Sequence, residues 1–155
     1  MNKKGFEVIQ TLKGEVYFLL NRINELEKKM EDFEKIKEKE TSTISIAYTI
    51  SGIYSCFEDI FEKIARCFEN RIENPASWHK EMLERMQIEV PDIRPSVLTQ
   101  RSFLILNRMR AFRHLFRSSY MFELDEKRLG LLVKEWKETR DLMKNDILEF
   151  LKKIK

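Results

Sequence analysis

One segment of the chain has residue types that can bind phosphate groups. From Arg101 to Phe122 there are five arginines, one histidine and no acidic residue, whereas charges of both signs mix elsewhere. Three of these arginines and a tyrosine recur at helical spacing and would form one stripe, Arg110, Arg113, Arg117 and Tyr120. Guanidinium groups match phosphate oxygens in a fork geometry that lysine lacks. The stripe therefore predicts a binding face for RNA or another polyanion.

The same segment has a second, apolar stripe that would face a protein core. It consists of Ile105, Met109, Phe112 and Phe116. His114 and Ser118 would lie on the far flank of the arginine stripe. A structural explanation of the arginines also stands, in which they pair with acids of neighbouring helices, such as Glu58, Asp59 and Glu62.

The sequence favours no other kind of site. His79 follows Trp78 at a predicted helix start, where a surface or packing role is expected rather than catalysis. The two histidines are far apart and the cysteines are not at ligand spacing, so neither a zinc site nor another cofactor is expected. Cys56 and Cys67 would lie about 16 Å apart along one helix, too far for a disulfide, and are expected to be buried thiols.

The composition indicates a helix-rich globular protein. The 155 residues are 43% hydrophobic and 35% charged, with only four glycines and three prolines. No apolar run approaches the roughly 20 residues that cross a bilayer, and the N-terminal segment has no apolar signal core. We therefore expect a cytoplasmic protein with no membrane partner, folded as a single domain over residues 1–155.

The first two predicted helices have long apolar stripes. Residues 9–33 form an unbroken seam at alternating three- and four-residue spacing, which is typical of a bundle or coiled coil. Lys28–Glu40 is nearly all charged, so this end of the helix is expected to project or fray and its acids to be solvated. A second helix is expected after Thr41–Thr43. Its broad stripe over residues 47–68 predicts the most buried helix.

Turn and capping residues divide the rest of the chain. Asn74-Pro75 predicts the start of a short helix that ends near Met86, followed by an irregular connection. Either Ser96 or Thr99 would cap the helix that holds the arginine stripe.

The last helix comes after a break at residues 122–124. Asp125 is its predicted cap, and its buried residues are expected at Leu129, Leu132, Val133, Trp136, Met143, Ile147, Phe150 and Leu151. The expected fold class is all-α, an antiparallel bundle of four long helices and one short helix.

The arginine-rich segment resembles the signature of the HEPN superfamily, particularly its HepT-like ribonuclease toxins. That signature is an arginine, four to six residues, and then a histidine, often followed one residue later by a tyrosine. Residues 113–120, Arg-His-Leu-Phe-Arg-Ser-Ser-Tyr, resemble it. Residues 77–80 through 90–95 resemble the segment before the motif in one HepT-like subgroup, and residues 123–129 resemble the segment after the motif.

This resemblance implies a helical bundle that dimerises with its motif helices face to face. The dimer would form a composite endoribonuclease site without metal, which makes the protein the toxin of a toxin–antitoxin pair. Its expected partners are RNA and a minimal nucleotidyltransferase antitoxin, which can adenylylate the motif tyrosine. By the motif, Arg113 is the catalytic arginine and Tyr120 the modified tyrosine, and Arg110 and Arg117 are further RNA-binding residues.

The motif histidine would fall at position 118, which is serine here. In the family's chemistry the histidine helps to deprotonate the RNA 2′-hydroxyl, and serine has no pKa near 7 with which to do so. One alternative is that His114, five residues beyond Arg108, supplies the base. Another is that Ser118 is an inactivating change, natural or introduced. A third is a non-catalytic HEPN module that binds RNA or the antitoxin through the same helix, and a purely structural helical dimer would be a fourth.

Overall fold

The computed structural model describes residues 2–69, 78–118 and 125–154. These residues form five α-helices and no strand. The helices are α1 (Lys3–Glu34), α2 (Lys39–Phe68), α3 (Trp78–Arg85), α4 (Gln100–Ser118) and α5 (Glu126–Lys153). The expected all-α fold, with four long helices and one short one, is confirmed.

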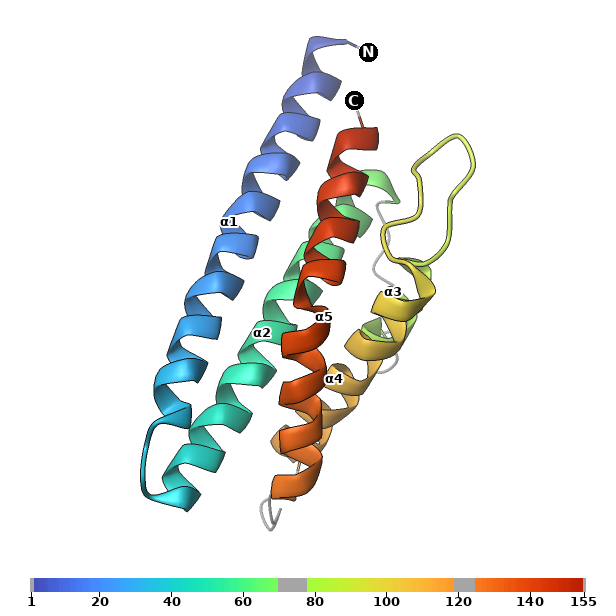
Figure 1. Cartoon of the computed structure of the whole chain (residues 1–155). Helices are drawn as coiled ribbons and strands as arrows, with labels where there is room; N and C mark the ends of the chain where they lie inside the picture. Colours follow the sequence, from blue (N-terminus) through green and yellow to red (C-terminus); the bar gives the residue numbers. More distant parts are fainter. Residues whose placement is uncertain (1, 70–77, 119–124, 155) are drawn as a thin grey trace.

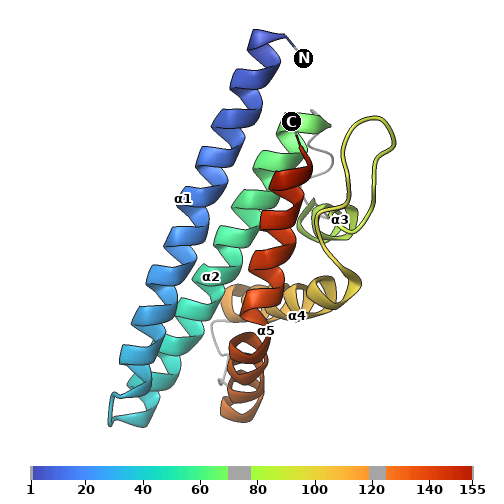
Figure 2. The same cartoon turned by 45° about the horizontal axis from the view of Figure 1, so that its top comes forward.

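The helices differ in how they are inclined. α1 and α2 form an antiparallel pair, and α5 runs beside them so that the two chain ends lie near one another (Figure 1). α4 crosses this group at a steep angle, and the short α3 contacts both α4 and α2 (Figure 2). α4 contacts α2, α3 and α5, so side chains of α2 and α3 can meet the arginine stripe.

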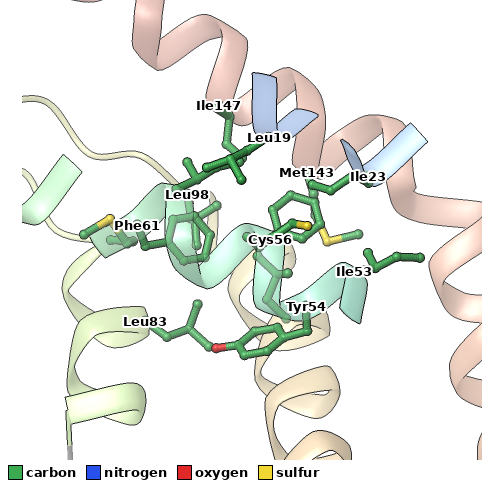
Figure 3. Packing of buried hydrophobic residues seen from close by; sticks show 14 of the residues in the cluster. Leu19, Ile23, Ile53, Tyr54, Cys56, Phe61, Leu83, Leu98, Met143 and Ile147 are labelled. Carbon is green, nitrogen blue, oxygen red and sulfur yellow. The ribbon is translucent and has the colours of Figure 1, made fainter. Parts of the chain in front are cut away.

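The apolar stripes meet in one core. The stripe of α2 is buried from Ala47 to Ala65, and α2 has more buried residues than any other helix, as predicted. Figure 3 shows side chains of α1, α2, α3 and α5 converging there, among them Tyr54 of α2 and Leu83 of α3. On α5 the predicted residues are buried except Val133, which is half-buried. Cys56 is a buried free thiol, whereas Cys67 is only half-buried.

The prediction that Lys28–Glu40 projects or frays is wrong. α1 continues to Glu34, Met30 is buried, and Glu34 forms an ion pair with Lys137 of α5 at 2.7 Å. α2 begins at Lys39, before the predicted Thr41–Thr43, because the carboxylate of Glu38 accepts hydrogen bonds from two free backbone N–H groups of its first turn. Glu38 therefore acts as a cap and Glu34 forms an interhelical pair, whereas Glu31, Asp32 and Glu40 are exposed, as expected.

The remaining helix ends agree with the predicted caps where these are described. Asp125 caps α5 by accepting from the backbone N–H groups of Lys127 and Arg128. Thr99, not Ser96, precedes α4 directly, and its hydroxyl accepts a 3.4 Å hydrogen bond from the N–H of Ser102. The predicted start at Asn74-Pro75 and the break at 122–124 lie outside the described residues.

Candidate functional site

Arg113 lies at the centre of a polar cluster between α4 and α2. Its side chain is 6% exposed, and its Nη2 group donates to Oε2 of Glu58 at 2.7 Å. Its Nη1 group donates to the hydroxyl of Ser55 at 3.1 Å, and the guanidinium lies 4.6 Å from the centre of the Tyr54 ring. α2 thus supplies an acid, a hydroxyl and an aromatic face to one arginine of α4. For Arg113, the structural explanation is therefore correct, because this arginine pairs with an acid of a neighbouring helix.

The cluster places Tyr54 and Asp59 in unusual surroundings. Burial, and secondarily the carboxylate of Glu58, raise the pKa of Tyr54, while Arg113 opposes this shift. The Tyr54 hydroxyl has no hydrogen-bond partner within the described part of the chain. Partial burial, together with the carboxylates of Glu62 and Glu58, raises the pKa of Asp59. Both groups are therefore held in their neutral forms more strongly than in water.

The other two arginines of the stripe are more accessible. Arg117 is exposed, and its Nη2 group lies 3.4 Å from the Ser55 hydroxyl. Arg110 is half-buried and donates to the side chain of Asn107 at 3.1 Å. Neither has an acidic partner within the described ranges. Arg110 and Arg117 therefore remain able to accept an anionic ligand, whereas Arg113 is already neutralised.

The candidate base residues on α4 lie beside this cluster at the surface. His114 and Ser118 are both exposed. The hydroxyl of Ser118 donates to the backbone carbonyl of His114 at 2.7 Å, a common arrangement for serine inside a helix. Tyr120 lies outside the described residues.

His79 joins the cluster from α3, which the sequence did not indicate. Its Nδ1 atom lies 2.8 Å from Oε2 of Glu58, the same oxygen that Arg113 contacts, and its side chain is 53% exposed. The only sequence feature that bears on the position of His79 is that it follows Trp78. Trp78 is 7% exposed and anchors the start of α3. A surface or packing role was expected for His79, and its side chain is exposed, but it also contacts the carboxylate that binds Arg113.

The described part of the chain has neither a metal-binding cluster nor a membrane span. Within residues 2–69, 78–118 and 125–154, no group of three or more His, Cys, Asp or Glu side chains is arranged to hold a metal ion. None of the helices in these ranges is both long and apolar enough to span a membrane.

Comparison with known proteins identifies the family. A family profile described as HepT-like protein matches residues 45–154, which is more than half of the chain and includes α3 to α5 and most of α2. No curated protein and no solved structure matches the chain. The matched region contains every residue of the cluster described above, from Tyr54 to Arg117. The chain therefore belongs to the HepT-like proteins of the HEPN superfamily.

Proposed function

We propose that this HepT-like protein is the toxin of a toxin–antitoxin pair, a metal-independent endoribonuclease that binds RNA along α4. The observation that supports this most directly is the pair of accessible arginines, Arg110 and Arg117, on the face that also holds Arg113. A guanidinium group without an acidic partner can donate two parallel hydrogen bonds to phosphate oxygens. Arg113 is paired with Glu58 and supports this face from behind, because it keeps Ser55 and Glu58 in place.

RNA binding is tested through the salt dependence of the affinity. Replacing Arg110 and Arg117 by alanine removes two phosphate contacts, so the slope of log K against log salt should fall by about 0.7 for each lost contact on single-stranded RNA. Arg22→Ala is the matched control, because Arg22 is an exposed arginine on α1. Affinity and slope that remain at the wild-type values after both changes would show that this face is only a solvated surface.

The RNA site is proposed to be shared by two chains whose α4 stripes face each other across a two-fold axis. One stripe is too narrow to hold a phosphodiester from two sides, and the axis doubles every donor. The repulsion between the two sets of arginines would be offset by bound RNA. Light scattering that shows a monomer at micromolar concentration would contradict the composite site.

The proposed antitoxin is a minimal nucleotidyltransferase that adenylylates Tyr120. Family membership supports this part of the proposal, and Tyr120 comes two residues after the end of α4 in the sequence. Incubation with ATP and the enzyme encoded beside the toxin should add AMP to the peptide that contains Tyr120. Tyr120→Phe should prevent the modification, and an unchanged mass increment in that variant would move the site to another residue.

Cleavage is tested with purified protein, total RNA and a chelator. Ser118→His places an imidazole at the motif position, and it should raise cleavage by roughly 10²-fold, the usual scale of a positioned general base, unless another residue already supplies that base. A second function, a non-catalytic binding module, is favoured by the Ser118 hydroxyl, which is bonded to its own helix and cannot act as a base near pH 7. Absence of cleavage by both wild type and Ser118→His, with normal folding, would establish the binding module.

A further inference from the structure

We propose that His79, held by Glu58, supplies the general base that position 118 of the motif helix lacks, an inference that rests on the ribonuclease function proposed above. The imidazole comes from α3, outside the motif helix. It therefore reaches the arginine cluster by tertiary packing and not by helical spacing.

The hydrogen bond to Glu58 sets the form of the imidazole. In the neutral ring, Nδ1–H donates to Oε2 of Glu58 across 2.8 Å, so the lone pair that can accept a proton is on Nε2. A carboxylate that orients a histidine in this way also stabilises the imidazolium that forms after proton uptake. The Glu58 side chain is 12% exposed and that of His79 is 53% exposed. The orienting acid is thus largely buried, and the reactive ring faces solvent.

The position of His79 is fixed by its buried neighbours. Trp78 directly before it is 7% exposed, and Met82 and Leu83 on the next turn of α3 are fully buried. Both belong to the same buried core as Tyr54, the aromatic ring on which Arg113 lies. α3 is therefore anchored against the floor of the arginine cluster. Such anchoring matters because catalytic geometry tolerates little displacement, and 1 Å can cost about 10²-fold in rate.

One continuous chain of contacts connects His79 to Arg117. It runs through three groups: the Glu58 carboxylate, the Arg113 guanidinium and the Ser55 hydroxyl. Arg113 in the middle is buried, whereas the two ends, His79 and Arg117, are exposed. The general base, His79, and a hydrogen-bond donor for phosphate, Arg117, are thus held by the same set of contacts. In the proposed complex, Arg117 binds the phosphodiester and the 2′-hydroxyl of the adjoining ribose lies at Nε2 of His79.

The cleavage step balances without a metal or a co-reactant. Nε2 of His79 takes the proton of the 2′-hydroxyl, and the 2′ oxygen forms a bond to phosphorus. The P–O5′ bond breaks, and the 5′ oxygen leaves with its electron pair and takes a proton from water. The imidazolium then returns its proton to solvent. The products are a 2′,3′-cyclic phosphate and a 5′-hydroxyl end, so RNA with a 2′-deoxy residue at the cleaved position cannot react.

His114 is the rival on α4. It adjoins Arg113 in the sequence, so it points about 100° away from it around the helix. The contact found between Ser118 and His114 uses the backbone carbonyl of His114 and leaves its ring unoriented. His79, in contrast, contacts the same carboxylate oxygen as the motif arginine.

The test compares RNA cleavage by single variants at equal RNA affinity. His79→Ala should lower the cleavage rate by at least roughly 10²-fold while RNA binding is retained, and added imidazole should restore part of the activity. His79→Asn keeps an N–H donor for Glu58 without a base, so it should be as inactive as His79→Ala. Lys80→Ala, an exposed change on the same helix, should cleave at the wild-type rate.

The outcomes separate this inference from the proposed function. Cleavage that survives His79→Asn but is lost in His114→Ala would overturn the role of His79 and leave the ribonuclease standing. The same holds if the wild type is inactive and Ser118→His cleaves, because His79 would then not supply a base. Absence of cleavage in both wild type and Ser118→His would overturn both proposals.

Discussion

Replacing Arg113 by alanine should destabilise the fold itself, because this arginine is buried and paired. Its side chain is 6% exposed and its only acidic contact within the described residues is Glu58, at 2.7 Å. Breaking a buried pair by removing one partner costs about 3–5 kcal/mol, since the other charge is left uncompensated. Glu58 retains His79 as a second partner, which places the expected loss near the lower end, at about 3 kcal/mol.

The loss is measured by urea and thermal unfolding, followed by circular dichroism at one protein concentration. For a chain of this size, a loss of about 3 kcal/mol corresponds to a fall in Tm of about 6–12 °C. Arg117→Ala is the matched control, because Arg117 is an exposed arginine of the same helix and should change stability by no more than about 0.5 kcal/mol. A double change of Arg113→Met with Glu58→Gln should cost less than the sum of the two single changes.

An Arg113→Ala variant as stable as Arg117→Ala would refute this reasoning. It would mean that Arg113 is not held by Glu58 in solution and is free to contact a ligand directly. The sequence left both pictures open, a stripe that faces a second chain and arginines that pair with acids of neighbouring helices. The two possibilities therefore predict free energies of unfolding for Arg113→Ala that differ by about 3 kcal/mol.

Two further changes test the local physics of the fold. Asp125→Ala removes the acceptor for the N–H groups at the start of α5 and should cost about 1 kcal/mol in unfolding free energy, measured by urea denaturation. Asp59→Asn should raise Tm at neutral pH, because burial and the nearby carboxylates raise the pKa of Asp59 in the folded chain. The folded state then binds this proton more tightly than the unfolded state, so ionisation destabilises it as the pH rises through the Asp59 pKa. The advantage of asparagine should vanish below the ordinary carboxyl pKa of the unfolded chain, where Asp59 is protonated in both states, and an advantage that persists there would contradict the assigned cause.

The sequence by itself determined the helices and the family. Apolar residues at helical spacing defined the buried faces of α1, α2 and α5, because a helix must bury its apolar stripe. Asp125 was recognisable as a cap from its type and place. The motif at residues 113–120, together with the segments before and after it, indicated the HepT-like family, which the match over residues 45–154 confirms. All of these signals are local in the chain.

Only the tertiary structure decided which charges meet. Arg113 and Glu58 are 55 positions apart, and His79 and Glu58 are 21 apart, so no helical period relates them. Likewise, the charged end of α1 was expected to project or fray but pairs with α5 through Glu34 and Lys137, 103 positions apart. Helical periodicity determines which residues share a face, but the inclination of α4 and the placement of α3 determine which faces meet. That choice depends on the summed packing of all five helices, and therefore no single segment specified the cluster of His79, Glu58 and Arg113.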